Sequence, residues 1–300
     1  MQWAEPVMGT VVSFLIREAT ERSGPATATG HTAAGPGDKK AAGAAGTRGG
    51  EPAPAAGAAG ADWAVGTRSP APMTALQAAI ASLHDADDVF STWKADSPMS
   101  RLRRAEIRLE QAPREVAEVL ALCENARDAS GGWFDPWRLP GGVDPTGLVK
   151  GWAAQRALGV LQRAGVPGAM VNAGGDIAVF GEPGPGRPWR IGIRDPRTRD
   201  GLLCVVAVRG PGAVATSGTY ERGAHIVDPL TGRPATSVLS ATVAGPDLSL
   251  ADALATALVA SGGRALEQIV RLPGYSALVV ARDFSMRATS GFPGLLPAVA

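Results

Sequence analysis

Cysteine and histidine are scarce in this chain of 300 residues. The two cysteines, Cys123 and Cys204, form neither a C-x-x-C pair nor a paired framework, which argues against a disulfide scaffold. Of the three histidines, His31 falls in a low-complexity tract and His84 in an acid-rich predicted helix. Histidine-based catalysis therefore has one candidate, His225.

Net charge and long apolar runs are also lacking. The formal charge of +1 gives no basic field that would favour nucleic acid. No apolar window reaches the roughly 18 to 20 residues that a membrane helix needs. The first apolar run, Val11–Ile16, has no basic region before it and no cleavage site or lipobox-type cysteine after it. We therefore expect a cytoplasmic protein that has no membrane segment and does not bind nucleic acid.

Bulky apolar residues are absent from Arg17 to Asp62, where alanine, glycine, proline and threonine dominate. Such a tract cannot bury enough surface to offset the entropy of ordering, so we expect it to be disordered. The segment before it is too short to form a domain of its own. We therefore expect a single domain made of residues 1–16 and 63–300, interrupted by a disordered insertion at 17–62.

Apolar periodicity predicts both helices and strands in the rest of the chain. Helices are expected at Ala71–Phe90, from Pro113 to about Gly131, from Val143 to about Ala164, at Leu248–Ser261 and at Arg264–Val270. Strands are expected at Val11–Ile16, Ala169–Asn172, Ile177–Phe180, Trp189–Arg194 and Ser276–Ala281. Lys94 to Ser100 is expected to be a loop, and the last residues of the chain a loose tail.

The stretch Ala215–Gly232 (ATSGTYERGAHIVDPLTG) combines small residues, a histidine, an aspartate and a Thr-Gly turn. The apolar segments Val205–Val208 and Ala241–Val243 are expected to be the two strands of the hairpin that it closes. The hairpin would present four candidate site residues on loops, namely Thr216, Ser217, His225 and Asp228. The alternative is that the turn formers only turn the chain and that His225 is a satisfied strand residue.

The pair Asp252 and Thr256 is spaced i, i+4 in a predicted helix, which puts a carboxylate and a hydroxyl on one face, one turn apart. Oxygen donors of this kind suit Mg²⁺, which usually takes one or two protein ligands besides water and substrate phosphate. The alternative is a polar helix start that faces solvent.

Three other segments each leave two interpretations open. Lys150 lies early in a helix that Asp144 or Thr146 would cap, where a cation opposes the helix dipole unless an anion binds nearby. Asn172–Asp176 has a double glycine that lets the backbone approach a ligand, although it is equally a hairpin turn. The aromatic block Gly131–Trp137 either caps the core or forms the wall of a pocket for a flat ligand.

Taken in chain order, these motifs resemble the ApbE-type FAD:protein FMN transferases. The segments that carry the resemblance are Met8-Gly9-Thr10, Phe90–Trp93 with Ser97 and Ser100, Trp133–Pro136, Asp144–Ala153, Asn172–Asp176, Ala215–Gly218, His225–Gly232 and Asp252–Thr256. They span essentially the whole chain outside the insertion, and their order makes the match specific. The resemblance implies an α+β fold of antiparallel sheets with flanking helices, in a single ApbE-like, T-fold-related domain.

Enzymes of that family cleave FAD and attach FMN through a phosphoester bond to a threonine or serine of a target flavoprotein, with release of AMP. The resemblance therefore implies FAD as the substrate and an acceptor flavoprotein as the partner. It implies FAD contacts from Met8, Trp93, Trp133, Phe134, Asp135, Asp144, Lys150 and Val227. It implies that Mg²⁺, or Mn²⁺ in its place, is held by the Gly147 carbonyl, Asp252 and Thr256. The implied catalytic residues are His225, as the base, and Lys150.

The chemistry of the reaction asks for the same groups. Breaking a pyrophosphate requires neutralisation of charge on the phosphoryl oxygens, which a metal and a lysine supply. A threonine hydroxyl is a poor nucleophile, and a histidine base would activate it. Two alternatives remain open: an FAD pyrophosphatase that uses water as the acceptor, and a flavin-binding module without catalysis. The second alternative is based on the shortened loops and on Ala255, where family members often carry an acidic residue.

Overall fold

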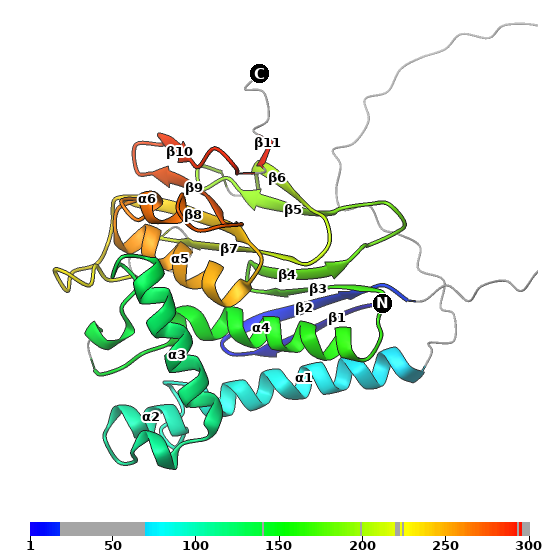
Figure 1. Ribbon diagram of the computed structural model, residues 1–300, viewed down its shortest axis with the longest axis horizontal. Coiled ribbons are helices and arrows are strands. Elements are labelled where there is room, and N and C mark those ends of the chain that lie inside the picture. The colour runs from blue at the N-terminus through cyan, green and yellow to red at the C-terminus, as the bar shows by residue number, and fades with distance from the viewer. Residues whose placement is uncertain are drawn as a thin grey trace, which may run out of the picture. The chain divides into compact units, whose positions relative to one another are not determined.

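A central sheet of eight strands carries the fold, in the order β1-β2-β3-β4-β7-β8-β9-β10, and every neighbouring pair is antiparallel (Figure 1). A second sheet has three strands in the order β11-β6-β5. The computed structural model describes residues 1–18, 70–139, 141–198, 200–219, 223, 225–292 and 294–295.

The elements have the following bounds. The strands are β1 (Gln2–Val7), β2 (Thr10–Ile16), β3 (Gly168–Ala173), β4 (Asp176–Gly181), β5 (Trp189–Arg194), β6 (Leu202–Val208), β7 (Gly212–Gly218), β8 (Val238–Gly245), β9 (Ser276–Ala281), β10 (Met286–Ala288) and β11 (Gly294–Leu295). The helices are α1 (Pro70–Phe90), α2 (Pro98–Arg103), α3 (Arg114–Ala129), α4 (Thr146–Arg163), α5 (Leu248–Ala260) and α6 (Leu266–Ile269). Short 3-10 turns lie at Leu109–Gln111 and Pro136–Arg138.

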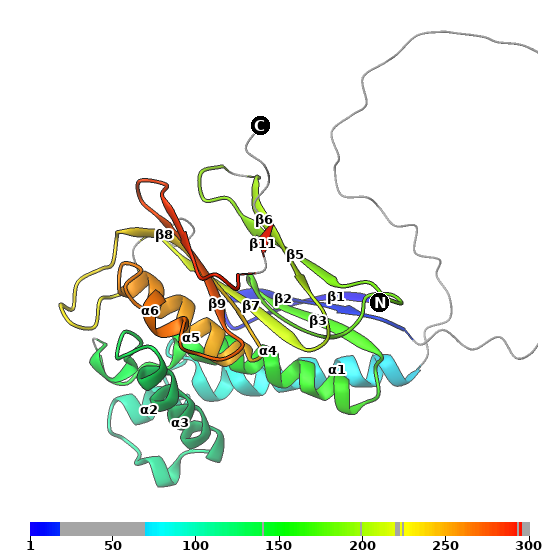
Figure 2. The ribbon, with the colours of Figure 1, turned by 45° about the horizontal axis from the view of Figure 1, so that its top comes forward.

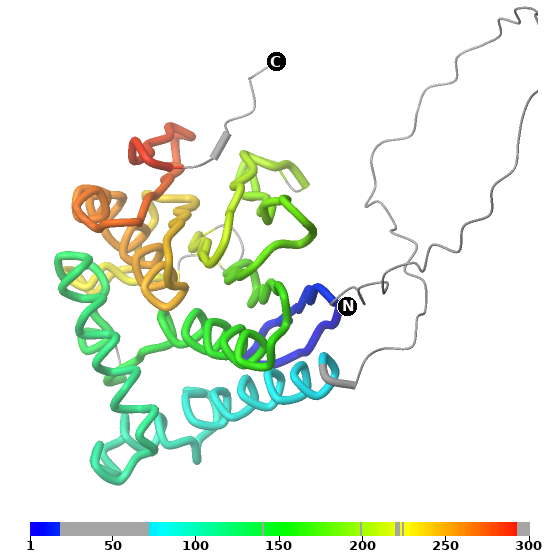
Figure 3. The backbone as a smooth tube through the Cα atoms, turned by 45° about the vertical axis from the view of Figure 1, so that its right-hand side comes forward, coloured from blue at the N-terminus to red at the C-terminus, as the bar shows by residue number. Residues whose placement is uncertain are grey.

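Helices cover one face of the central sheet. α4 packs on β3 and β4, α5 packs on β7 and β8, and α1 lies beside α4 (Figure 3). The main hydrophobic core fills the space between these helices and the sheet, with Phe14, Leu148 and Leu254 among its fully buried side chains. Alanine is frequent in α4 and α5, and glycine in α4, and these small residues let the two helices approach each other and the sheet closely.

The three-stranded sheet covers the opposite face of the central sheet (Figure 2). Side chains of β4 alternate between the two sides. Ile177 and Val179 pack against the inward side chains of β5 and β6, whereas Ala178 and Phe180 belong to the core beneath the helices. Both faces of β4 are therefore buried, which explains its unbroken apolar sequence.

Most of the predicted elements are confirmed, and so is the fold class of antiparallel sheets with flanking helices. The helices expected at 71–90, 143–164 and 248–261 correspond to α1, α4 and α5, and the strands at 169–172 and 177–180 to β3 and β4. Both cysteines are buried and unpaired. No helix in the described part of the chain has the length and hydropathy needed to cross a membrane. From residue 19 on, the expected insertion lies outside the described residues, and the domain boundaries stay predictions.

The expected hairpin around Ala215–Gly232 is wrong in its strands. Val205–Val208 belongs to β6 in the small sheet. β8, which contains Ala241–Val243, pairs instead with β9 and with β7, in which Thr216 lies opposite Thr242. Thr216 and Ser217 therefore lie in a strand and not on a loop. Small residues resemble a turn in the sequence, but here they lie beneath α5, where bulkier side chains would separate the helix from the sheet.

Other short elements were missed by the sequence analysis. Part of the expected loop from Lys94 to Ser100 forms the start of α2, where Ser97 is the N-cap and Pro98 the first helical residue. The strand β1 precedes the Met8-Gly9 turn, and β10 and β11 form in the expected tail. All three of these strands lie at sheet edges, where one pairing partner suffices and the apolar pattern is weak.

Candidate functional site

The first turns of α4 and α5 meet at Gly151. A Cβ at this position would lie 2.5 Å from the Leu248 carbonyl oxygen and 3.0 Å from the Asp252 Cβ, so only glycine permits the contact. The Gly151 N–H donates a hydrogen bond of 3.0 Å to Asp252 Oδ2. This close approach brings the polar residues that begin the two helices into one place.

Asp252 is buried, with an exposed fraction of 2%. The alternative of a helix start that faces solvent is therefore wrong. Its Oδ1 lies 3.6 Å from Lys150 Nζ. Burial raises the pKa of the Asp252 carboxyl, whereas the Lys150 ammonium and the Gly151 N–H oppose that rise by favouring the charged form. A charge in such a position requires a compensating cation.

Two hydroxyl groups and one glycine lie next to this carboxylate. Thr256 lies one turn after Asp252 on α5, and its Oγ1 is 3.3 Å from Ser217 Oγ on β7. A Cβ built on Gly147 would lie 3.6 Å from Thr256 Oγ1. The predicted i, i+4 face of α5 therefore points at the start of α4, and the three predicted metal donors are neighbours.

These donors fit a hard divalent cation. A carboxylate, a hydroxyl and a backbone carbonyl are oxygen ligands of the kind Mg²⁺ takes together with water and phosphate. An ideal helix would aim the Gly151 N–H at the Gly147 carbonyl, but this N–H also donates to Asp252 Oδ2, so the carbonyl keeps capacity for a cation. The described residues contain no cluster of three or more His, Cys, Asp or Glu side chains, so a nitrogen or sulfur site has no support among them.

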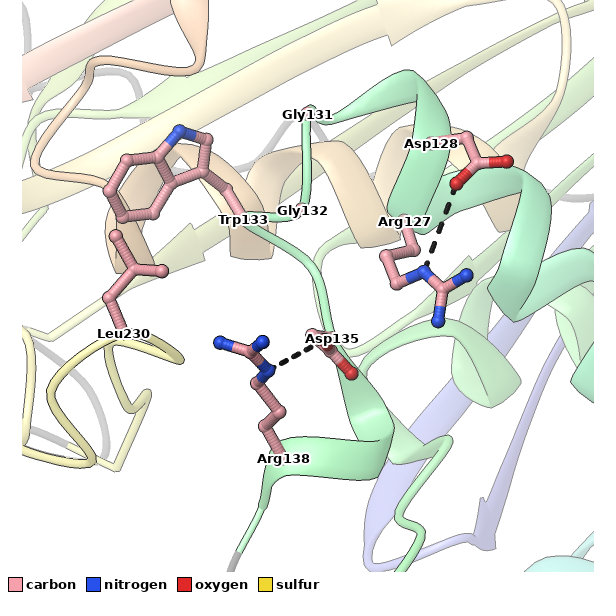
Figure 4. A pocket seen from close by; sticks show the side chains of 8 residues that line it. All are labelled: Arg127, Asp128, Gly131, Gly132, Trp133, Asp135, Arg138 and Leu230. Carbon is pink, nitrogen blue, oxygen red and sulfur yellow. Dashed lines mark ion pairs between the residues drawn. The ribbon is translucent and has the colours of Figure 1, made fainter.

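A pocket of about 550 Å³ lies beside the aromatic block (Figure 4). Its lining residues are Arg127, Asp128, Gly131, Gly132, Trp133, Asp135, Arg138 and Leu230. The Trp133 indole and the Leu230 side chain approach each other at one side of this pocket. The Arg264 guanidinium covers the Trp133 ring, 4.3 Å from its centroid. The aromatic block therefore forms part of a pocket wall.

The neighbours of Trp133 have structural tasks as well. Phe134 is buried, its N–H donates to Ser130 Oγ at 3.0 Å, and its ring edge would lie 3.2 Å from a Cβ on Gly147. Asp135 accepts the Trp137 N–H at 3.1 Å. Phe134 therefore links the pocket to the polar cluster at the start of α4.

The other predicted FAD contacts are more dispersed, and Met8, Trp93, Asp144 and Val227 do not line this pocket. Met8 is half-buried in the β1–β2 turn with a φ of 56°, and Val227 forms a bridge with Pro234. Trp93 is 95% exposed.

The carboxylate of Asp144 is held in place from two sides. It accepts the Thr146 N–H at 3.0 Å and the Arg103 Nη1 at 3.0 Å. The predicted N-cap at Asp144 or Thr146 is off by one residue, since the cap position falls on Pro145. Asp144 nevertheless satisfies a donor of the first turn of α4.

His225 lies on the connection between β7 and β8 with its ring exposed. Its Nδ1 is 3.0 Å from the Gly223 carbonyl oxygen, and this is the only hydrogen bond of the ring within the described part of the chain. The structure thus does not bring His225 into contact with Lys150, Asp252 or Thr256. Its assignment as a base stays a prediction.

Sequence comparison decides the family. The model of the ApbE family matches residues 55–140 and 138–279, which together make up most of the chain. The chain belongs to the ApbE family. A relative from Rhodobacter capsulatus, named "FAD:protein FMN transferase", is 37% identical over 166 residues, which are 52% of this chain and 31% of the relative.

A second relative and two solved structures are also similar to this chain. A relative of the same name from Vibrio cholerae is 34% identical over 166 residues, 51% of this chain and 50% of the relative. The chain thus spans half or less of the length of these curated relatives. The solved flavin transferase ApbE from Vibrio cholerae has the same fold, with a TM-score of 0.72 and 20% identity over 98% of this chain and 99% of that one. The ApbE protein from Thermotoga maritima has a TM-score of 0.70 and 21% identity over 97% of both chains.

One carboxylate of the candidate site was not predicted from the sequence. Asp176 opens β4 with an exposed fraction of 1%, forms an ion pair with Lys150, and accepts the Thr216 N–H at 2.9 Å. In the sequence, the double glycine of Asn172–Asp176 is the conspicuous feature of this motif, and nothing local marks its aspartate as a site residue. A buried carboxylate so close to a lysine is recognisable only once β4 and α4 are packed together.

Proposed function

We propose that this chain is an FAD:protein FMN transferase. It would cleave the pyrophosphate of FAD, attach FMN by a phosphoester bond to a threonine or serine of a target flavoprotein, and release AMP. Membership of the ApbE family and the names of the relatives support this proposal. The observation that carries it is the gathering of Lys150, Asp252 and Thr256 where α4 and α5 meet, next to a pocket walled by Trp133.

The proposed reaction is an in-line displacement at phosphorus. The acceptor hydroxyl oxygen bonds to the FMN phosphorus while the bond from that phosphorus to the bridging oxygen breaks, and AMP leaves with the bridging oxygen. The hydroxyl proton passes to His225 and from there to solvent. Lys150, whose side chain lies beside the two carboxylates and is 25% exposed, is proposed to bind a phosphoryl oxygen.

The Gly147 carbonyl, Asp252 and Thr256 are proposed to hold Mg²⁺, or Mn²⁺ in its place. The ion would neutralise charge that develops on the phosphoryl oxygens. Ser217 contributes by hydrogen bonding to the Thr256 hydroxyl and so fixing its rotamer.

The flavin is proposed to bind along the aromatic block. Trp133 offers a ring face and Asp135 a carboxylate at the pocket wall, and the buried Phe134 between them in the chain packs against Gly147. Met8, Trp93, Asp144 and Val227 are proposed to contact other parts of FAD, and the exposed ring of Trp93 is available to a ligand or to the acceptor protein.

The proposal is tested by incubating the protein with FAD and Mg²⁺, with and without an acceptor domain, and following AMP, FMN and the acceptor mass. AMP release with an acceptor mass gain of one FMN unit supports the transferase. Free FMN and AMP irrespective of acceptor would instead identify a pyrophosphatase, and intact FAD with every acceptor a binding module.

Asp252 provides the sharpest variant for this assay. Asp252→Ala is expected to abolish transfer and leave the circular dichroism spectrum unchanged, because it removes the carboxylate of the proposed metal site. Asp247→Asn is the matched control on the same helix, since Asp247 caps α5 through the Leu250 N–H and asparagine caps equally well. Equal transfer by Asp252→Ala and Asp247→Asn would rule out the metal assignment.

A further inference from the structure

Lys150 lies between two buried carboxylates and is closer to one of them than to the other. Its Nζ forms a direct ion pair with Asp176 Oδ2 and is 3.6 Å from Asp252 Oδ1. Two ionised carboxylates and one ammonium leave a net charge of −1, and both carboxylates are almost closed to solvent. One lysine is therefore insufficient to neutralise the pair.

Asp176 is fixed by the backbone around it. It follows the two-residue β3–β4 turn, in which Gly174 and Gly175 have φ values of 62° and 102°. A Cβ on Gly174 would lie 2.5 Å from Thr10 Oγ1, so the turn fits closely against β2. Asp176 Oδ1 accepts the Thr216 N–H at 2.9 Å, which ties the carboxylate to β7. Its Oδ2 thus has a set position from which to hold the lysine.

Asp252 is fixed through its other oxygen. Oδ2 accepts the Gly151 N–H, whereas Oδ1 has only the long ion pair with Lys150 among its contacts within the described part of the chain. Oδ1 is therefore the oxygen that remains available to a further cation. If Lys150 moved onto it, the ammonium would occupy the same place and repel a divalent ion.

We propose that Asp176 is the counter-ion of Lys150 that holds the ammonium group away from Asp252 Oδ1, and so leaves this oxygen to a divalent cation. Asp176 is thus a positioning residue, since it acts through Lys150. The inference rests on the metal site of the proposed function. In this arrangement Asp176 binds the lysine and Asp252 binds the metal ion, so that both positive charges lie beside the pyrophosphate of the substrate.

The test measures Mn²⁺ binding to the whole chain by the loss of the free-ion signal in electron paramagnetic resonance, with no flavin present. Asp176→Asn keeps an acceptor for the Thr216 N–H and removes the charge that holds Lys150. It is expected to weaken Mn²⁺ binding by about tenfold or more, because the freed ammonium pairs with Asp252. Asp176→Asn combined with Lys150→Met is expected to regain the wild-type affinity, since the competing ammonium is gone.

A crystal structure of Asp176→Asn separates positioning from a plain change of net charge. Lys150 Nζ is expected within about 3 Å of Asp252 Oδ1 in this variant. A lysine that stays at its original distance would overturn the proposal, and so would a double variant that binds as weakly as the single one.

The same titration distinguishes failure of the inference from failure of the metal assignment. Wild-type binding that Asp252→Asn abolishes and Asp176→Asn leaves unchanged overturns only the role of Asp176. Absence of Mn²⁺ binding to the wild type overturns the metal site and the inference with it. The flavin transfer assay stands apart from both results.

Discussion

The backbone N–H of Gly151 on α4 and the Asp252 carboxylate on α5 are joined by a hydrogen bond of 3.0 Å. This single contact fixes the distance between the two helix starts on which the candidate site depends. It exists because Gly151 has no side chain to hold the helices apart. A packing requirement and a chemical requirement therefore coincide at one residue.

Gly151→Ala is expected to destabilise the protein by roughly 1 to 3 kcal/mol, because the added methyl group meets the Leu248 carbonyl and the α4–α5 contact must widen. Mn²⁺ affinity should fall with it. Gly159→Ala on the same helix is the control, since its methyl group meets only the mobile end of Arg163 and should stabilise the helix by about 0.5 to 1 kcal/mol. Urea unfolding of both variants checks this, and equal stabilities would contradict it.

Arg264→Ala is expected to weaken FAD binding about two- to fivefold, because a cation–π contact of about 0.5 to 1 kcal/mol no longer orients the Trp133 ring. Flavin fluorescence titration provides the measurement. Arg156→Ala removes a similar pair, with the Arg156 guanidinium 5.2 Å from the centroid of the Trp152 ring outside the pocket, and should leave the affinity unchanged. Equal losses in the two variants would show that Arg264 has no local role.

His225→Gln is expected to lower the transfer rate by roughly a hundredfold or more if the histidine takes the acceptor proton. FAD affinity should stay as in the wild type, because the predicted role concerns only the acceptor. His84→Gln is the control, since His84 pairs with Glu5 on β1 at 2.9 Å and lies on α1. A full transfer rate in His225→Gln would remove the histidine from the mechanism.

The buried thiol of Cys123 leads us to expect a loss of stability at alkaline pH. Burial raises the pKa of its thiol to about 12 from an ordinary value of 9.0. An acid with a raised folded-state pKa stabilises the fold fully below pH 9.0, and this contribution is lost as the pH rises toward 12.

Between pH 8 and pH 10 the wild type should therefore lose about 1 kcal/mol more of unfolding free energy than Cys123→Ala. Urea unfolding at the two pH values measures the difference. The alanine variant starts from a lower stability because of the cavity, so the comparison concerns the slopes. Parallel slopes would mean that the thiol ionises equally in both states.

Local patterns in the sequence were sufficient to predict the candidate site residues at the starts of α4 and α5. The i, i+4 spacing of Asp252 and Thr256 predicted one shared face, and Gly165 correctly marked the end of α4. The position of Lys150 early in α4 left open whether an anion binds nearby, and in the structure two protein carboxylates, Asp176 and Asp252, lie beside it. These signals are short-range, and the sequence displays them directly.

Contacts between distant segments were beyond the sequence. The ion pair of Lys150 with Asp176 requires β4 to pass beneath α4, and the place of Ser217 next to Thr256 requires β7 to pair with β8. The small residues of β7 resemble a turn in the sequence. They are small because α5, from another part of the chain, packs closely on them. Leu230 likewise joins the pocket only through the folded loop.

The two apolar clusters on opposite sides of the central sheet have a consequence for local unfolding. The hairpin of β5 and β6 is held mainly by the smaller cluster, whereas α4 and α5 belong to the larger one. Opening of this hairpin leaves the Gly151 to Asp252 contact intact. Amide protons of Ile191 and Ile193 should then exchange with solvent through a low-energy opening, while the Gly151 amide exchanges only when the whole domain unfolds. We therefore expect the three-stranded sheet to open locally while the candidate site, on the other face of the central sheet, keeps its structure.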